Sequence, residues 1–426
     1  MYIILGLGVS NKAVISKLKE LNKDFIVVVN SNEIDEAIKY SDNIITFEKM
    51  KYLDFNKVKY VIKSPGIPYH NNYVKFLKSK HVKIINEIEL TYILTNKIGR
   101  YIGISGSVGK SSVVSLLYEL VKAKYNNVIL AGNIGTPLIT YFNNINKDTI
   151  IILELSSFQL DDFLNMKLDI ALLLNIYDNH LDVYKNKEKY YLAKFKLTNK
   201  QTKKNYFVTN LDNKLIKKYI LSHCFKSSLI DYKTGFSISH NYLYYYKVKI
   251  ANLNYYSLKG NHNLDNLKAV ITILTILNID FDNKVLLKFE PLKYHLEERI
   301  YNGITIVNDS KSTSCSSLLS AIDTYKDRNI ILLFGGCNKN LDFSAINQYK
   351  FKYLICFGSL SSTIDKMVKV DIKFDSLYQA IKFASKVAGK DDVILFSPGC
   401  ASFDEFNNYI DRGKAFNNYI EELYHD

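Results

Sequence analysis

Short runs of apolar residues alternate with amphipathic segments along the first ninety residues of the chain. The runs Tyr2–Leu5, Phe25–Val29 and Tyr60–Ile62 predict buried strands, and Ala13–Leu21 has the periodicity of a helix. Strands without polar alternation, separated by helices, are typical of parallel sheets. We therefore expect residues 1–93 to form one α/β unit.

The same alternation continues beyond this unit. Apolar runs predict strands at Val128–Leu130, Ile150–Leu155, Ile170–Asn175, Ile304–Asn308, Ile330–Phe334, Tyr353–Phe357 and Val393–Phe396. Lys204–Tyr256 has short alternating runs rich in tyrosine and favours antiparallel strands, and His262–Leu277 predicts a helix. We expect an α/β protein of three domains joined end to end, at residues 1–93, 94–285 and 286–426.

One segment has the pattern of a binding site for a nucleoside triphosphate. An apolar run from Tyr101 leads into glycines at 103, 106 and 109, followed by Lys110, Ser111 and Ser112 and then by a helical pattern. In such a phosphate-binding loop, backbone N–H groups and the helix N-terminus surround the phosphates, with a lysine and a hydroxyl nearby. We expect Gly106 and Gly109 to border the phosphates, Lys110 to reach the terminal ones, and Ser111 to bind Mg²⁺.

Other polar residues stand where predicted strands end, which is where ligands bind in open α/β sheets. They are Glu154, His180, Asp182 and the segment Asn308–Lys311, and Lys194 lies in a helical stretch. The turn Gly6-Leu-Gly8 after the first strand is also compatible with a nucleotide-like ligand.

The net charge of +14 raises the possibility of nucleic-acid binding. Only four of the 56 basic residues are arginines, and the lysines are spread over the whole chain. A binding face would show clustering, so we interpret the charge as a solvated surface and expect no nucleic-acid partner.

The sequence does not indicate a membrane-spanning segment, a cysteine-based zinc site or a disulfide framework. No apolar run approaches the ~18–20 residues of a membrane span, and the N-terminus begins with a strand pattern, so we expect a cytoplasmic protein without a membrane partner. The five cysteines lack the spacing of a zinc site or a disulfide framework.

Taken together, these motifs resemble the Mur ligases of bacterial peptidoglycan synthesis, in family order and over nearly the whole chain. The segments around Asn133, Ser156–Gln159 and Cys400–Phe403 are similar to those of the D-glutamate-adding members. The matching segments are Gly103–Ser112, Ala131–Pro137, Glu154–Leu160, Asn175–Asp182, Tyr191–Lys194, Gly260–Asn263 with Asn266, Asn308–Thr313, Gly335–Phe343 and Ser397–Phe403.

The resemblance implies an ADP-forming amide ligase of small molecules. A Rossmann-like first domain holds UDP, a central P-loop domain with a parallel sheet holds ATP, and a Rossmann-like last domain closes over them. The L-alanyl carboxylate of UDP-N-acetylmuramoyl-L-alanine (UDP-MurNAc-L-Ala) attacks the γ-phosphate of ATP, and D-glutamate then displaces phosphate from the acyl phosphate. A monomer is expected.

The resemblance also implies roles for individual residues. Ser111 and Glu154 hold one Mg²⁺, and His180 with a carbamylated Lys194 holds a second. Lys110 and Lys311 are catalytic together with Glu154, His180 and Lys194. Nucleotide contacts come from Gly106, Gly109, Lys110, Ser111, Ser112, Asn263, Asn266, Asp309 and Lys311.

Substrate contacts follow from the same resemblance. The UDP part is expected at Gly8, Val9, Ser10, Asn30, Asn32, Ser64 and Gly66. The muramoyl part is expected at Asn133, Ser156, Gln159 and His180, and the D-glutamate carboxylates at Thr313, Lys339, Ser402 and Tyr409.

Three positions depart from the family pattern. Val108 replaces an asparagine of the phosphate loop, and Asn179 stands where an aspartate precedes the histidine. His295-Leu296 replaces a His-Arg pair, so an arginine that contacts ATP is missing unless Arg299 takes its place. The alternatives left open are a different Mur step, a folylpolyglutamate synthase, a partly decayed enzyme and a nucleotide-dependent nucleic-acid-binding protein.

Overall fold

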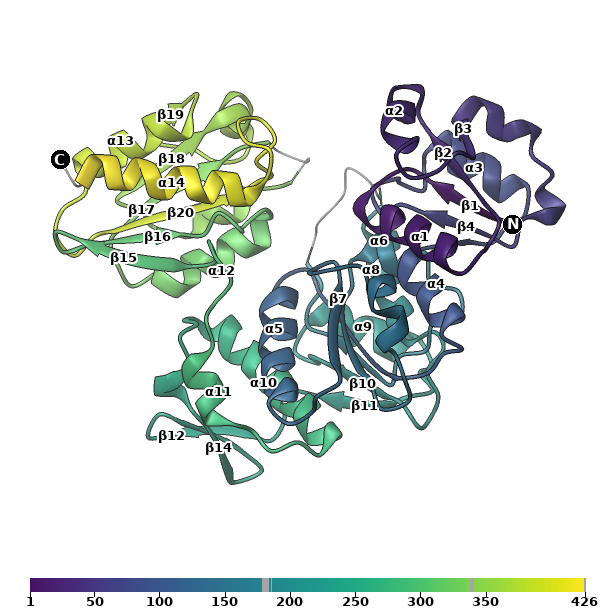
Figure 1. Cartoon of the computed structure of the whole chain (residues 1–426). Coiled ribbons are helices and arrows are strands. Elements are labelled where there is room, and N and C mark those ends of the chain that lie inside the picture. The colour runs from purple at the N-terminus through teal and green to yellow at the C-terminus, as the bar shows by residue number, and fades with distance from the viewer. Residues whose placement is uncertain (178–183, 185, 338–340, 425–426) are drawn as a thin grey trace.

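The computed structural model describes residues 1–177, 184, 186–337 and 341–424, and they form three α/β units. Figure 1 shows the N-terminal and C-terminal units above the central one, on opposite sides of it. Each unit has its own sheet with an apolar core on each face. The expected fold class, three α/β units with a parallel central sheet, is confirmed.

The N-terminal unit is a parallel sheet of order β3-β2-β1-β4-β5. Because β1 lies between β2 and β4, their carboxyl ends form the point where the strand order reverses, which is a binding position in such sheets. Its elements are β1 (Tyr2–Leu5), α1 (Val9–Glu20), β2 (Phe25–Val29), α2 (Ile34–Ala37), β3 (Ile44–Thr46), β4 (Tyr60–Lys63), α3 (Asn72–Ser79), β5 (Ile84–Ile85) and α4 (Glu87–Leu94).

The central unit has a parallel sheet of order β11-β10-β9-β6-β8-β7 and a small antiparallel sheet, β12-β13-β14. Its larger elements are β6 (Arg100–Ser105), α5 (Lys110–Lys122), β7 (Val128–Gly132), β8 (Ile150–Glu154), α6 (Ser157–Asp161), β9 (Ile170–Leu173), α8 (Lys187–Phe195), β10 (Tyr206–Thr209), α9 (Lys214–Ser222), β11 (Ser228–Asp231), β12 (Phe236–Ser239), β13 (Tyr242–Tyr245), β14 (Val248–Asn252), α10 (Asn261–Leu277) and α11 (Asn283–Lys288).

The C-terminal sheet has the order β15-β16-β20-β17-β18-β19, with β15 antiparallel to β16 and the other pairs parallel. Its elements are β15 (Glu297–Tyr301), β16 (Ile304–Asn308), α12 (Cys315–Tyr325), β17 (Ile330–Gly335), β18 (Tyr353–Phe357), β19 (Ile372–Phe374), α13 (Leu377–Val387), β20 (Val393–Gly399) and α14 (Tyr409–Tyr424).

The antiparallel interpretation of Lys204–Tyr256 is wrong in its first half. β10 and β11 are parallel members of the main sheet, and α9 connects them. The reason is burial: Phe207 and Val208 of β10 are both fully buried, one on each face of the sheet. Only β12–β14 are antiparallel.

Two helices bear on the domain boundaries. On α4, Leu90 packs in the N-terminal core while Ile88 and Tyr92 pack in the central core, so this helix joins the two units. The expected boundary at residue 285 falls inside α11, whose Leu286 is buried in the central core. We therefore propose to place that boundary after Phe289.

Candidate active site

A cavity of about 330 Å³ lies between the central and C-terminal units. Loops and helix starts from both units line it, with α5 and α10 below and α12 above in the view of Figure 1. The lining residues on which the site depends are Gly106, Gly109, Lys110, Ser111, Ser112, Asn133, Glu154, Ser156, Lys194, Asn266, Asp309, Lys311, Thr313 and Tyr409.

The phosphate-binding loop has a conformation that requires glycine. Gly109 has φ of 86°, and a Cβ built there would lie 2.6 Å from Asn266 Oδ1. A side chain at this position would therefore strain the backbone and collide with Asn266. Helix α5 begins at the next residue, Lys110, so its first N–H groups face the cavity as an anion site.

The side chain of Asn175 fixes this loop. Its Oδ1 accepts hydrogen bonds from the backbone N–H groups of Ser107 and Val108, both at 3.0 Å, and its Nδ2 donates to the Val108 carbonyl at 3.1 Å. The Ser107 hydroxyl lies 3.0 Å from the hydroxyl of Tyr190. Asn175 thus binds backbone atoms of the loop. The valine side chain at position 108 does not alter these hydrogen bonds, because they involve only the backbone of that residue.

Two lysine side chains, from Lys110 and the buried Lys194, converge on one carbonyl group. Lys110 Nζ and Lys194 Nζ donate to the carbonyl of Gly106, at 2.8 and 2.9 Å. Burial lowers the pKa of Lys110, opposed by the charge of Glu154. Burial, and then the charge of Lys110, lower the pKa of Lys194 well below its ordinary value. The ammonium of Lys110 is suited to phosphate oxygens, whereas Lys194, with its depressed pKa, is readily neutral.

Glu154 has one carboxylate oxygen ready for a cation. The residue is 2% exposed, its Oε1 accepts from Asn133 Nδ2 at 2.9 Å, and its Oε2 is buried without a hydrogen-bond partner. A buried carboxylate oxygen in a cavity that Ser111 also lines suits Mg²⁺, which prefers oxygen ligands. Among the residues that the structure describes, no group of three or more His, Cys, Asp or Glu side chains could hold a metal ion.

The C-terminal unit contributes the opposite wall. Burial raises the pKa of Asp309 to about 7, and Asp309 Oδ2 accepts from the Ser397 hydroxyl at 2.7 Å. Burial lowers the pKa of Lys311 to about 8, and Glu154 opposes this effect while Lys110 adds to it. Lys311 therefore adds a third lysine to the cavity, from a different unit than Lys110 and Lys194.

Several expected site residues lie elsewhere or are otherwise engaged. Asn263 is fully buried behind Asn266, and its Oδ1 accepts from Asn266 Nδ2 at 3.1 Å. Gln159 Oε1 accepts from the Ser156 N–H and hydroxyl as part of a capping box of α6. Ser402 is buried outside the lining of the cavity. His180 and Lys339, as well as Asn179, lie outside the described residues.

Arg299 does not take the place of the missing arginine. Its guanidinium lies on β15 and pairs with Glu421 at 2.7 Å and Glu297 at 3.2 Å, while Leu296 lines the cavity. Arg299 therefore does not supply the arginine that the sequence lacks at position 296. The strand register of β15 directs this side chain to the neighbouring α14.

The residues expected to hold UDP gather at the carboxyl edge of the N-terminal sheet. Gly8 caps α1, and a Cβ built there would lie 2.6 Å from the hydroxyl of Ser64, which directly follows β4. Val9 and Ser10 begin α1, Asn30 caps the turn after β2 that holds Asn32, and Gly66 is exposed. They come from the three strands at the point of reversal, β1, β2 and β4.

The sequence pattern missed several residues of the site. Asn175, Tyr190, His262 and His295 all bond or border the phosphate loop, and burial lowers the pKa of His295 to about 3. The buried Arg412 donates to the carbonyl groups of Ser310 and Cys400 and holds the loop that carries Asp309. Asn175 and His262 lie within matching segments and His295 precedes the departure at Leu296, but no role was expected for them, and nothing in the pattern pointed to Tyr190 or Arg412.

A family model, related sequences and solved structures all show similarity to this chain. Residues 104–274 match the family model described as the Mur ligase middle domain. The chain is 31% identical to the UDP-N-acetylmuramoylalanine–D-glutamate ligase of Bacillus subtilis (strain 168), over 99% of this chain and 97% of that one. It is 32% identical to the ligase of the same name from Cytophaga hutchinsonii, over 99% and 98%.

Solved structures share the fold. The MurF ligase of Thermotoga maritima in complex with ADP superposes with a TM-score of 0.62 at 16% identity, covering 94% of this chain and 95% of that one. A pseudomurein peptide ligase type C from Methanothermus fervidus gives a TM-score of 0.61 at 14% identity, covering 99% of both chains. In the part of the chain that the structure describes, no helix combines the length and the apolar character that a membrane crossing requires.

Proposed function

The chain belongs to the Mur ligase family, and we propose that it adds D-glutamate to UDP-MurNAc-L-Ala with hydrolysis of ATP to ADP and phosphate. The two ligases described above are named for that reaction, and the similarity covers 97% and 98% of their lengths. The observation that supports the proposal in this chain is the convergence of Lys110, Lys194 and Lys311 on one cavity beside Glu154.

The chemistry follows from this arrangement. Phosphoryl transfer requires neutralised charge and in-line positioning more than covalent assistance. Lys110 and Lys311 approach from opposite walls and hold the terminal phosphates, while the N–H groups at the start of α5 bind the oxygens between them. A muramoyl carboxylate bound at Asn133 and Ser156 would attack the γ-phosphorus of ATP and release ADP, which leaves an acyl phosphate. The amine of D-glutamate would then attack the acyl carbon, lose a proton and expel inorganic phosphate, which completes the amide bond.

The described residues offer oxygen ligands for one of the two expected Mg²⁺ ions. Glu154 Oε2 and the Ser111 hydroxyl would hold one Mg²⁺, which supplies charge neutralisation for the phosphates. We propose a second Mg²⁺ at His180 and a carbamylated Lys194. The lowered pKa of Lys194 supports this assignment, because carbamylation requires a neutral amine.

The amine substrate is proposed to bind in the C-terminal unit. Thr313 and Tyr409 line the cavity and are available as donors to carboxylates, and Lys339 is assigned to the same task from the sequence. As the resemblance implies, we propose a monomer. We also propose that it acts in the cytoplasm.

An amino-acid panel tests the proposed function. ADP release with UDP-MurNAc-L-Ala should occur with D-glutamate and fall by about a hundredfold or more with D-glutamine, D-alanine or L-glutamate, because a site that pairs two carboxylates rejects analogues that leave a donor unpaired. Lys339→Ala should raise the KM for D-glutamate far more than the KM for ATP. Comparable turnover with L-glutamate, L-lysine or a folate acceptor would assign the chain to a different amide ligase.

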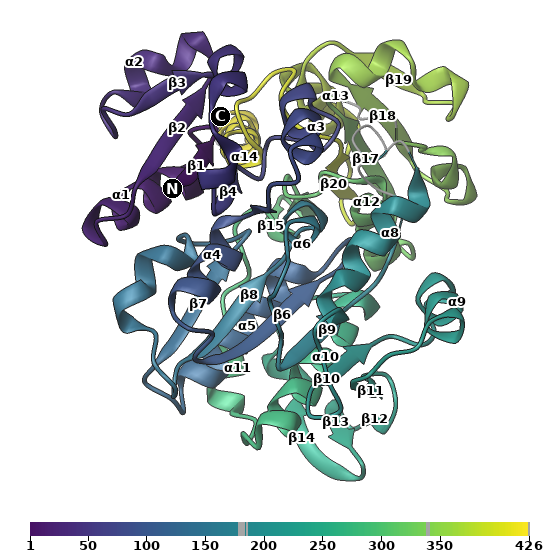
Figure 2. The same cartoon turned by 90° about the vertical axis from the view of Figure 1, so that its right-hand side faces the viewer.

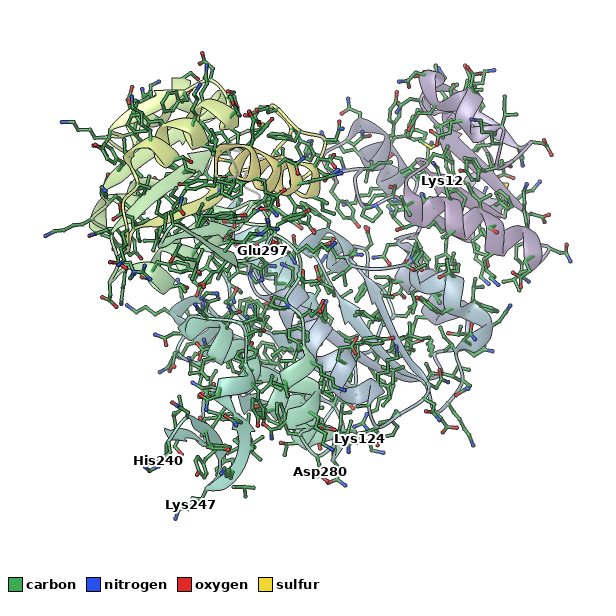
Figure 3. All side chains as sticks on the ribbon, turned by 60° about the vertical axis from the view of Figure 1, so that its left-hand side comes forward. Lys12, Lys124, His240, Lys247, Asp280 and Glu297 are labelled. Carbon is green, nitrogen blue, oxygen red and sulfur yellow. The ribbon has the colours of Figure 1, made fainter. Side chains whose placement is uncertain are left out.

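The nucleic-acid alternative has a separate test. Figure 3 shows Lys12 on the N-terminal unit, Lys124 on the central unit and Lys247 at the lower end of the molecule, so these three charges do not cluster. We expect no retention of RNA or DNA in a filter-binding assay at two salt concentrations. Salt-dependent retention would contradict this expectation.

The pH dependence should report on Lys311. Its pKa is lowered to about 8, so its positive charge is present below that pH and is lost above it. We expect kcat/KM for ATP to fall as the pH rises through about 8. In the Lys311→Arg variant the charge persists, and this alkaline decline should disappear. A decline that is identical in the variant would assign it to another group.

A further inference from the structure

A buried polar junction joins the N-terminal unit to helix α6 of the central unit. Lys63, the last residue of β4, has a side chain that is 1% exposed, and its Nζ lies 3.1 Å from Oδ2 of the fully buried Asp162. The same Nζ donates to the carbonyl groups of Ile67 at 3.0 Å and Ser64 at 3.4 Å. The ammonium thus has two carbonyl acceptors and one carboxylate oxygen at ion-pair distance.

A tyrosine from the same segment completes the junction. The hydroxyl of Tyr69 lies 2.5 Å from Asp162 Oδ1 and 3.2 Å from the carbonyl of Asp161. A separate contact comes from the start of α4, where Asn86 Nδ2 donates to the carbonyl of Gln159 at 2.7 Å. The N-terminal unit therefore holds α6 at its carboxyl end and along its last turn.

Helix α6 connects this junction to the cavity. Its other end is capped by Ser156, which lines the cavity, and Glu154 precedes that cap by two residues. On the opposite side, Lys63 is followed directly by Ser64, which packs on Gly8 at the proposed UDP site. The junction thus lies between the two sites that one elongated substrate must occupy; Figure 2 shows α6 between β4 and the central sheet.

We propose that Lys63, Tyr69 and Asp162 are positioning residues that fix the UDP-binding edge relative to the carboxylate-activating cavity, and so select acceptors that carry the nucleotide. This inference rests on the proposed function. An ion pair that is fully buried contributes little net stability, and its directional contacts are better suited to fixing one arrangement of two packed units. Binding energy from the remote nucleotide can then be used to align the reacting carboxylate.

The test compares two acceptors, UDP-MurNAc-L-Ala and N-acetylmuramoyl-L-alanine without the nucleotide. Tyr69→Phe removes only the hydroxyl, and Lys63→Met combined with Asp162→Asn removes the charges together, leaving none unpaired. We expect both proteins to lose about tenfold in kcat/KM with the UDP-linked acceptor, the effect of one hydrogen bond to a charged group. The loss with the truncated acceptor should be less than about twofold.

A purely structural role predicts a different pattern. Equal losses with both acceptors would overturn the inference, because the junction would then only support α6. Lys57→Met is the matched control, since Lys57 is exposed in the same unit and pairs with Asp54 at 3.7 Å. It should leave both values unchanged. Inactivity of the wild type with the UDP-linked acceptor would contradict the proposed function itself.

A binding measurement keeps the inference testable without turnover. UDP alone, as the probe, should slow amide hydrogen exchange in residues 157–161 of the wild type, because the junction transmits the ordering of the N-terminal edge. The same concentration of bound UDP should leave exchange there unchanged in the Lys63→Met/Asp162→Asn protein. Equal protection of α6 in both proteins would overturn the inference.

Discussion

Replacing Lys110 with alanine is expected to lower ATP-dependent turnover by about 10²–10³-fold or more, since it removes a cation that faces the transferring phosphate. The side chain is half-buried, and its ammonium donates to the backbone carbonyls of Gly106 and Ser107 at 2.8 and 3.2 Å. We therefore expect the positive charge of Lys110 to bind an anion that enters the cavity. ADP release with saturating substrates measures the effect.

The fold should survive this substitution. The carbonyl of Gly106, which accepts from Lys110, also accepts from Lys194 at 2.9 Å, so this carbonyl keeps a donor when Lys110 is replaced. The melting temperature and circular dichroism should therefore match the wild type. Lys124→Ala, at an exposed position just beyond the same helix, is the control and should keep full activity. Normal ADP release from a folded Lys110→Ala protein would contradict the nucleotide site.

The second large effect is expected at Lys194. Lys194→Ala should be nearly inactive and should regain part of its activity with added short carboxylic acids, because these replace the proposed carbamate oxygen ligands. The residue is 2% exposed, and Lys110 shares its carbonyl partner, so the neutral amine that reacts with CO₂ is populated at lower pH than for an ordinary lysine.

A readout apart from turnover is available for the same residue. Wild-type protein supplied with ¹³C-labelled CO₂ and Mg²⁺ should show a carbamate carbon resonance that Lys194→Ala lacks. Lys189→Ala is the matched control, since Lys189 lies on the same helix but is exposed. It should keep both the resonance and the activity. A plain ammonium at Lys194 under these conditions would contradict the carbamate assignment.

The local features of this protein were determined by the sequence alone. The phosphate loop is contiguous, so the spacing of its glycines, Lys110 and Ser111 specifies a backbone path and a helix start without help from distant residues. The strands β1 and β2 begin and end where their apolar runs predict. A strand that is buried on both faces has apolar side chains at every position, so the run of apolar residues marks its ends. Glu154 likewise stands at the carboxyl end of β8 as expected.

Other features were decided only by the packing of the units. Sequence similarity could not show that Gln159 caps its own helix, that Asn263 lies behind Asn266, or that Arg299 turns toward Glu421. Asn175 reaches the phosphate loop across 67 residues of sequence, and Lys63 meets Asp162 across two units. Such contacts depend on how sheets and helices lie against one another in three dimensions. A pattern along the chain predicts where a residue sits in its own element, but its partner is set by the elements that burial brings beside it.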